Sequence, residues 1–490
     1  MMPGTTILPG EKDELGFFDQ TLRNLRAVWR SIAGDGYDAD VAKLRPHLPS
    51  DDLKALKSQM RDCLGGKGGA VSARARAAAL GQVYLALDET GRSRFLRLLA
   101  DGFDVDHDAV RMAAAKVASP DLKTRDRPRA EDELRRSLES PRKQLLTQFT
   151  DLPEGVKFLV DMRADLLGPL KKDKALEPLE RDLKSLLATW FDVGFLELKR
   201  ITWDGAPAAL LEKFIAYEAV HAIESWSDLK NRLGWDRGLF AYFHPRMPDE
   251  PLIFVEVALV EGIADNVREL LDEDAPLRDP AEADTAIFYS ISNAQKGLAG
   301  ISFGDFLIKR VVGLLTAEFP NLGTFATLSP IPGFRTWLSD RLREGDDEFL
   351  SAIERSKLKV LDDKEPDPRK ILKNLMKSDD WLDDPRTRKK AEGILTRLCA
   401  RYLLEAKRPA KVSEGPETAR DPVAHFHLNN GARVERMNWF ADQSEKGGKQ
   451  SFGLMVNYLY ELADIDKNHE AYRSEGLIAA SGSVKGLVKN

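Results

Sequence analysis

Cysteine is scarce in this chain of 490 residues, which contains two cysteines and seven histidines. Cys63 and Cys399 lie far apart in the sequence and show none of the spacings typical of a metal site or a redox pair. Such a sparse pattern argues against a disulfide-stapled scaffold and is typical of a reducing compartment. We expect both cysteines to be small buried hydrophobic residues.

The chain also lacks a basic excess and long apolar runs. Lys and Arg number 73 against 79 Asp and Glu, a net charge of −6, which gives no overall reason to expect a nucleic acid partner. No run of eighteen apolar residues occurs, so no membrane span is predicted. The start lacks the basic and apolar regions of a signal peptide, and the end is not a peroxisomal address. We expect a cytoplasmic protein with neither a membrane nor a nucleic acid partner.

The sequence changes character near residue 190, which predicts a multidomain protein. Apolar residues recur at helical spacing in the first part, so residues 1–189 are predicted to form an all-α helical bundle. One such stripe consists of Phe18, Leu22, Leu25, Trp29 and Ile32. The charge-dense stretch 123–143 within it reads as a solvated helix face or as an interaction surface.

The second part, residues 190–490, is predicted to be a mixed α/β domain. Short β-branched and aromatic stretches such as "PLIFVEVALV" and "TAIFYSIS" read as strands, and they alternate with amphipathic helices. A charged helical insertion is expected at about 343–420. The stretches "VAHFHLNNGARVERMNW" and "FGLMVNYLYEL" are read as closing strands.

A glycine-rich junction, "FYSISNAQKGLAGISFGDFLIKRVV", follows one predicted strand and opens a predicted helix. Gly297, Gly300 and Gly304 would let backbone N–H groups approach an anion at the start of that helix. Their spacing matches neither the Rossmann fingerprint nor the P-loop, and a flexible turn remains the alternative. The cations Lys309 and Arg310 read as a solvated helix face or as neighbours of the anion.

Ser329 ends the predicted strand "TFATLS" and precedes Pro330, which restricts it to an extended conformation. It therefore stands at the C-terminal edge of the sheet, where the sites of α/β proteins usually lie. A cap for the following helix is the competing interpretation. No G-x-S-x-G elbow is present, which argues against a hydrolase serine.

Two histidines, His425 and His427, occur together in "AHFHL". In an extended segment both would point to one face. The other histidines are scattered, so three readings stay open: a metal half-site, one functional histidine beside a bystander, or a structural histidine.

Taken together, several blocks resemble malonyl-CoA decarboxylases. They are spread in family order over roughly residues 158–442 and include "FLVDMRADLL", "YFHPRMPDEPLIFVEVAL", "AIFYSISNAQKGLAGISFGDFLIKRVV", "FATLSPIPGF", "FHLNNGA" and "NWFAD". The resemblance implies an N-terminal helical domain that joins subunits into a homodimer or a dimer of dimers. It also implies a catalytic domain like the GNAT-type N-acetyltransferases, which bind coenzyme A where two parallel strands splay apart.

The resemblance also implies site residues. Ser329 and His427 occupy the positions of the family's catalytic serine and histidine, and Tyr458 occupies that of a tyrosine lining the site. His425 is then an incidental neighbour. The stretch for binding malonyl-CoA consists of Ala299, Gly300, Ile301, Ser302, Phe303, Gly304 and Asp305.

The activity implied is conversion of malonyl-CoA to acetyl-CoA and CO2, with no metal and no cofactor beyond the coenzyme A of the substrate. A thioester enolate would be protonated with the help of a Ser329–His427 pair. The competing functions are a CoA-dependent acyltransferase of the same fold and a catalytically dead CoA sensor.

Overall fold

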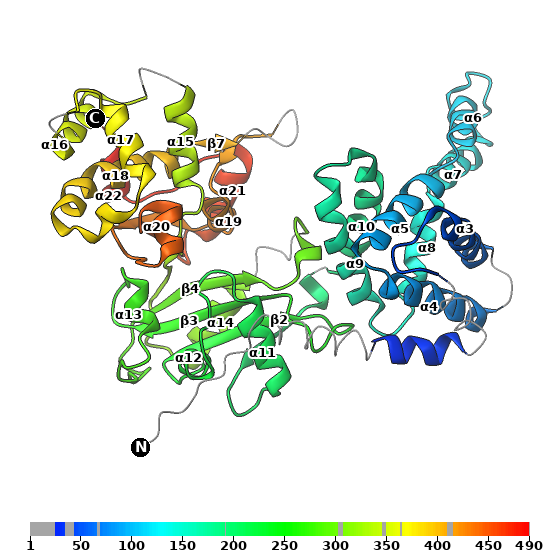
Figure 1. The fold of residues 1–490 in the computed structure, drawn as a ribbon, viewed down its shortest axis with the longest axis horizontal. Helices are drawn as coiled ribbons and strands as arrows, with labels where there is room; N and C mark the ends of the chain where they lie inside the picture. Colours follow the sequence, from blue (N-terminus) through cyan, green and yellow to red (C-terminus); the bar gives the residue numbers. More distant parts are fainter. Residues whose placement is uncertain are drawn as a thin grey trace. The chain divides into compact units, whose positions relative to one another are not determined.

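The computed structural model describes residues 25–34, 44–65, 69–191, 193–301, 307–344, 349–362, 365–408 and 415–489. Phe18 and Leu22 of the predicted stripe lie outside these ranges, as does the predicted binding stretch from Ser302 to Asp305. The chain forms two compact units (Figure 1). Unit 1 comprises Met1–Glu197, Tyr242–Leu252 and Asn293–Gly304, and unit 2 comprises Leu198–Ala241, Ile253–Ser292 and Asp305–Asn490.

Unit 1 is built mainly of helices: α3 (Ser50–Leu64), α4 (Ala70–Ala86), α5 (Glu89–Gly102), α8 (Pro141–Phe149), α9 (Gly155–Leu170) and α10 (Glu177–Trp190). Alanine-rich α4 has nine consecutive buried residues, and Asp88 caps α5 by accepting from the N–H of Gly91. The rings of Trp29, Phe149 and Phe158 pack together in the core at centroid distances of 4.8–6.2 Å. The sequence therefore predicted the helical character of this region correctly.

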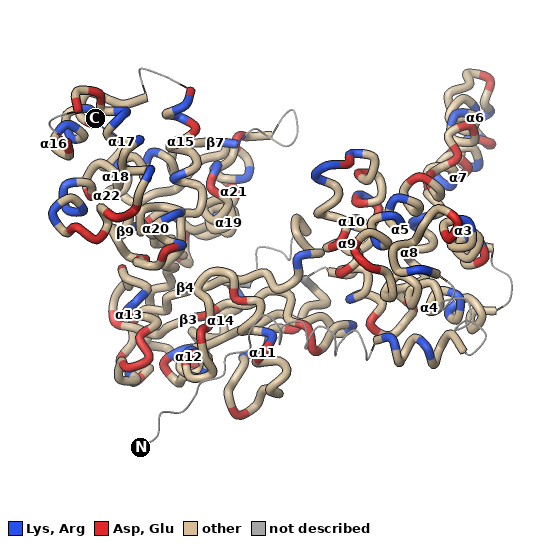
Figure 2. The backbone as a smooth tube through the Cα atoms, in the orientation of Figure 1, with Lys and Arg blue, Asp and Glu red and all other residues tan. Residues whose placement is uncertain are grey.

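Helices α6 (His107–Ala118) and α7 (Arg127–Ser137) pack mainly against each other. Each buries a single alanine, Ala113 or Ala130, and both signs of charge line their surfaces (Figure 2). Their charge-dense sequence is thus largely exposed.

Unit 2 contains most of a mixed sheet of eight strands, whose order is β1-β2-β3-β4-β5-β10-β6, with β9 also paired to β10. The strands are β1 (Glu197–Ile201), β2 (Arg237–Phe243), β3 (Ile253–Val260), β4 (Thr285–Asn293), β5 (Thr324–Thr327), β6 (Ser329–Pro330), β9 (Arg433–Asn438) and β10 (Met455–Leu459). Strands β2 and β3 are almost continuously buried, which explains why they read as unbroken apolar runs rather than alternating ones. The strands predicted over "PLIFVEVALV" and "TAIFYSIS" are confirmed as β3 and β4.

Strands β4 and β5 begin as a parallel pair and then separate. The ladder joins Thr285–Phe288 to Thr324–Thr327, and its last hydrogen bond runs from Leu328 N–H to Phe288 O at 3.1 Å. Beyond it β4 continues to Asn293, whereas β5 and β6 follow β10 in one antiparallel register. The split between the two strands therefore begins one residue before Ser329.

Several helices complete unit 2: α11 (Ala208–Tyr217), α12 (Trp226–Arg232), α13 (Val267–Leu271), α14 (Leu307–Glu318), α15 (Phe334–Glu344), α16 (Ala352–Leu361), α17 (Pro368–Lys377), α18 (Pro385–Glu405), α19 (Pro422–Asn429), α20 (Glu445–Ser451), α21 (Ile465–Glu475) and α22 (Gly482–Val488). Short 3-10 turns in the two units are η1 (Lys174–Leu176), η2 (Val193–Phe195), η3 (Lys296–Leu298) and η4 (Asp380–Asp383), and a small hairpin pairs β7 (Lys407–Arg408) with β8 (Thr418–Ala419).

Both cysteines are free and buried, as predicted. No helix of the described residues is long and apolar enough to cross a membrane.

One predicted element is wrong. The stretch "VAHFHLNN" is helix α19 and not a strand, and only the following residues form strand β9. Asp421 accepts hydrogen bonds from the N–H groups of Val423 and Ala424, and Pro422 occupies the first turn, where its missing N–H costs nothing. This cap starts a helix where alternation of apolar and polar residues suggested a strand.

Candidate functional site

The position of His427 is set by the two ends of α19. Asp421 caps the N-terminus, and its second oxygen accepts from Tyr402 Oη at 3.2 Å and from Gly333 N–H at 3.3 Å. Gly431 ends the helical segment with φ +82°, a conformation that favours glycine. His427 therefore lies in the last turn of a short helix that is fixed at both ends.

Ser329 lies in β6, and its side chain is directed by the register of β6 along β10, in which it pairs with Val456. The helix that follows, α15, begins only at Phe334. Ser329 is therefore not its cap, and the competing interpretation from the sequence is wrong. Pro330 pairs with Met455 in the same register, consistent with an extended backbone at Ser329.

A chain of hydrogen bonds joins four side chains at this point. Ser329 Oγ lies 3.1 Å from His427 Nε2 and donates to Thr327 Oγ1 at 2.8 Å. His427 Nδ1 lies 2.8 Å from Tyr460 Oη. Because the single proton of Ser329 points to Thr327, the pattern assigns the imidazole proton to Nε2 and makes Nδ1 the acceptor from Tyr460.

Tyr458 contacts His427 through its ring. The two rings stack at 4.5 Å with an interplanar angle of 23°. Tyr458 is fully buried, and its hydroxyl has no hydrogen-bond partner among the described residues. Its backbone N–H donates to Thr327 Oγ1 at 3.1 Å, at the point where the ladder between β10 and β9 shifts register.

The surroundings of His427 are apolar enough to control its charge. Burial lowers the pKa of His427 to about 3, so the imidazole is neutral at pH 7. Burial also raises the pKa values of the Tyr458 and Tyr460 hydroxyls, which stay protonated. The site is therefore an uncharged donor and acceptor chain before any substrate binds.

His425 faces a different neighbour. Two residues along an α-helix are separated by about 200°, so the side chains of His425 and His427 leave the helix on different sides. His425 Nδ1 lies 2.8 Å from Tyr472 Oη in α21. The same-face arrangement considered for an extended segment is therefore wrong, and no group of three or more His, Cys, Asp or Glu residues that could hold a metal occurs among the described residues.

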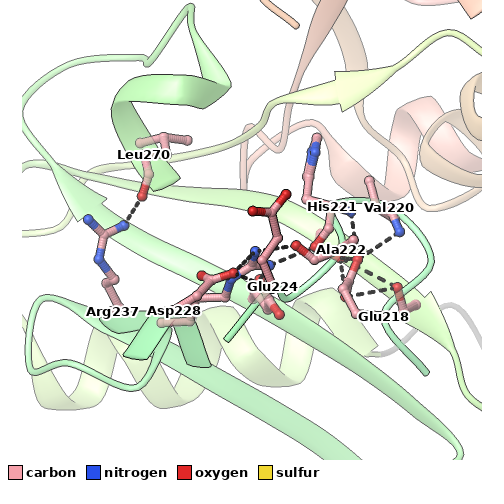
Figure 3. A network of polar contacts seen from close by, with 12 residues as sticks. Glu218, Val220, His221, Ala222, Glu224, Asp228, Arg237 and Leu270 are labelled. Carbon is pink, nitrogen blue, oxygen red and sulfur yellow. Dashed lines mark hydrogen bonds and ion pairs between the residues drawn. The ribbon is translucent and has the colours of Figure 1, made fainter. Parts of the chain in front are cut away.

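A buried polar network surrounds Glu218 (Figure 3). Ser290 in β4 and Ser329 in β6 each stand two residues past the last pair of the β4–β5 ladder, Phe288 with Thr327. Ser290 donates to the Glu218 carboxylate at 2.8 Å, and that carboxylate also accepts from the N–H groups of Val220 and His221. The split thus has a serine on each side.

Arg232 holds this network in place. Its guanidinium donates to Asp228 at 2.7 and 3.0 Å, to Glu256 at 3.0 Å, and to two carbonyls of the Glu218 loop. Burial raises the pKa of Glu256 to about 8. These contacts fix the loop that supports Ser290.

The described part of the glycine-rich stretch, residues 297–301, belongs to unit 1. Ala299, Gly300 and Ile301 form a turn after η3, and Gly300 has φ +73°. Lys309, by contrast, lies on α14 in unit 2 and pairs with Asp466 at 2.8 Å. The part of the predicted stretch from Ser302 onwards lies outside the described residues.

Sequence reasoning missed Tyr460, Thr327, Ser290 and Glu218. "NYLY" places Tyr458 and Tyr460 on the same side of a strand, which could have drawn attention to both. Glu218 and Ser290 are 72 positions apart, and nothing in their local sequence marks the contact.

Comparison with known proteins connects this site to one family. Residues 194–490 match the model of the malonyl-CoA decarboxylase C-terminal domain, and residues 103–191 match that of the N-terminal domain. A mitochondrial malonyl-CoA decarboxylase of Rattus norvegicus is 39% identical over 409 residues, covering 81% of this chain and 82% of the relative.

Solved structures of malonyl-CoA decarboxylases are also similar to this chain. The crystal structure of malonyl-CoA decarboxylase from Rhodopseudomonas palustris has a TM-score of 0.79 and 41% identity, covering 89% of this chain and 99% of that one. The corresponding structure from Agrobacterium vitis has a TM-score of 0.77 and 38% identity, covering 89% and 100%.

Proposed function

Because this chain belongs to the malonyl-CoA decarboxylase family, we propose that Ser329 and His427 are the residues with which it decarboxylates malonyl-CoA. The enzyme is a carboxy-lyase that forms acetyl-CoA and CO2. The observation that supports the two residues is their contact of 3.1 Å at the split between β4 and β5.

The reaction places three demands on a site. The bond between the carboxylate and the α-carbon breaks, CO2 leaves, and the electron pair moves into the thioester carbonyl to give an enolate. One proton must then reach the α-carbon. The site has to orient the carboxylate out of the thioester plane, stabilise the enolate oxygen and supply that proton.

Ser329 and His427 fit these demands as a pair. Ser329 engages the malonyl carboxylate. His427, after taking up a second proton together with the substrate, passes the proton on Nε2 to the α-carbon directly or through Ser329 Oγ and returns to the neutral form. Tyr460 orients the imidazole through Nδ1. A positioned acid typically contributes about 10²–10⁴-fold, and each donor to a developing oxyanion about 3–4 kcal/mol. The free hydroxyl of Tyr458 is a candidate donor to the substrate.

The same proposal covers coenzyme A and the fold. The separation of β4 and β5 supports a GNAT-type catalytic domain, in which the pantetheine arm lies between the parted strands. The stretch from Ala299 to Asp305 would then bind the CoA pyrophosphate through backbone N–H groups. No cofactor is needed, because the thioester itself accepts the electrons released with CO2.

Assembly and location complete the proposal. We expect a homodimer or a dimer of dimers formed through the helical region, and a cytoplasmic location, although the Rattus norvegicus relative is named mitochondrial. Light scattering at micromolar protein concentration tests the first expectation, and a strictly monomeric enzyme would contradict it.

Incubation with malonyl-CoA alone tests the reaction. We expect equal amounts of CO2 and acetyl-CoA without any added amine. Turnover that requires an amine would identify an acyltransferase instead, and binding without turnover would identify a sensor. The same assay on Ser329→Ala and His427→Asn tests the two assigned residues.

A further inference from the structure

The turn at residues 297–301 is held by the helices of unit 1. A Cβ on Gly297 would lie 1.8 Å from Val160 O, so the turn packs directly on the backbone of α9. Arg163, also on α9 and only 2% exposed, donates to Gly297 O at 2.5 Å and to Ala299 O at 2.9 Å. The guanidinium is held in turn by Glu180 of α10 at 2.6 Å.

The two hydrogen bonds from Arg163 to the turn, called the clamp below, determine which backbone groups of the turn remain available to a ligand. The N–H groups of Leu298, Ala299 and Ile301 donate within the turn, to Gln295 O, Lys296 O and Leu298 O. The N–H of Gly300 has no such bond among the described residues. In a trans peptide the N–H points away from its carbonyl, and Arg163 holds the Ala299 carbonyl of that peptide. The Gly300 N–H is therefore directed away from the clamp.

A cation lies beside this free donor. A Cβ on Gly300 would be 3.4 Å from Lys184 Nζ, which α10 brings to the turn. Lys184 is half-buried, and in the part of the chain that the structure describes it has neither an ion pair nor a hydrogen bond. The acid one turn before it, Glu180, is already paired with Arg163.

We propose that Lys184, from the helical region, together with the Gly300 N–H, binds the pyrophosphate of the CoA substrate. An ammonium group and a backbone N–H at one glycine turn form a donor pair suited to a phosphate oxygen. The inference rests on the proposed function for the identity of the substrate. It gives the helical region a direct role in substrate recognition, beyond the subunit contacts expected of it.

Substrates that differ only in their phosphates test the proposal. Malonyl-pantetheine carries the reacting group and no phosphate, whereas malonyl-dephospho-CoA keeps the pyrophosphate and lacks the 3′-phosphate. We expect Lys184→Gln to raise KM for malonyl-CoA and for malonyl-dephospho-CoA roughly tenfold or more, the size of one charge-assisted hydrogen bond, with kcat almost unchanged. KM for malonyl-pantetheine should not change.

Two matched variants act as controls. Lys184→Arg keeps the charge and should keep most of the affinity. Lys116→Gln removes an equal charge from an exposed pair with Glu133 on α6 and α7, and should leave every KM unchanged. Raising the salt concentration should shrink the difference between wild type and Lys184→Gln.

The remaining outcomes overturn the proposal. An equal rise in KM for all three substrates would show a structural role for Lys184, and an effect confined to the substrate with the 3′-phosphate would rule out the pyrophosphate. If the wild-type enzyme releases no CO2 from any of them, the proposed function fails separately. Calorimetry would then decide the inference, which predicts that Lys184→Gln weakens binding of CoA but not of pantetheine.

Discussion

At the scale of the single residue, burial decides the state of His427 before substrate arrives. Its pKa of about 3 makes the imidazole neutral in the free enzyme. A malonyl carboxylate placed beside Ser329 brings a negative charge next to the ring, and such a charge raises the pKa of a neighbouring histidine. We therefore expect the site to take up, together with the substrate, the proton that the α-carbon later receives.

Replacing each histidine of α19 in turn tests this assignment. We expect His427→Asn to lower kcat by about 10²–10⁴-fold, because the acid is lost while the side chain keeps a similar size. His425→Asn removes only the contact with Tyr472 and should keep most of the activity. Steady-state assays, with CoA binding measured in parallel, give the comparison. The opposite ranking of the two variants would show that the wrong histidine has been assigned.

Ser329→Ala separates catalysis from stability. We expect kcat to fall by roughly 100-fold or more while the melting temperature hardly changes, because Ser329 caps no helix. A melting curve measured beside the rate assay checks both. Loss of about 1 kcal/mol of stability with an unchanged kcat is the result expected of a cap, and it would contradict the catalytic role.

The sequence could nominate Ser329 and His427 as candidates but could not predict what surrounds them. Ser329 stands out because a strand ends before a proline, and the family resemblance selects His427 from the pair. Tyr460 reaches Nδ1 only because β10 runs antiparallel to β5 with Leu459 opposite Ala326. Register between strands 130 residues apart is set by tertiary packing, which local patterns do not encode.

At the scale of the element, α19 shows how a short helix escapes detection. Eight residues give barely two turns, too few for a 3.6-residue period to outweigh an apparent alternation. The informative signal was the Asp421–Pro422 pair, which is typical of a helix start. Long apolar strands such as β3 were predictable because complete burial leaves an unbroken apolar run.

The cap of α19 should matter for activity as well as stability. Asp421→Ala removes acceptors from the helix N-terminus, Gly333 and Tyr402 together, so we expect a loss of about 2 kcal/mol and a lower kcat as His427 shifts relative to Ser329. Asp421→Asn can still cap and should lie closer to wild type. Denaturant unfolding and rate assays measure both effects.

A second cap provides the control. Asp384 caps α18 through the N–H groups of Arg386 and Thr387, but it is exposed. Asp384→Ala should therefore lower stability through its own helix and leave kcat unchanged. An equal loss of kcat in both variants would show that activity follows general stability rather than the position of α19.

At the scale of the whole molecule, buried neutral histidines make the enzyme sensitive to acid. The pKa of His427 is about 3 in the folded chain and about 6.5 when unfolded, so the unfolded state binds more protons at intermediate pH. This contribution to stability is fully present above about pH 6.5 and is lost as the pH falls towards 3. His221, with a pKa lowered to about 4 by burial, acts in the same direction.

Comparing pH values measures this effect. Between pH 7 and pH 5 we expect wild type to lose about 2 kcal/mol more unfolding free energy than His427→Asn, which has no group to titrate there. Denaturant unfolding at the two pH values gives the difference. Equal losses in the two proteins would mean that His427 is accessible and titrates near its ordinary pKa.

The path of the chain has a consequence for evolution and for protein engineering. Unit 1 takes up Tyr242–Leu252 and Asn293–Gly304 in addition to the N-terminal region, so the chain leaves unit 2 and returns to it twice. Arg163 and Val160 then co-adapt with a turn more than 130 positions away. A chimera of two relatives joined near residue 193 would combine mismatched partners at that turn. Recombination should succeed only when all three segments are inherited from one parent.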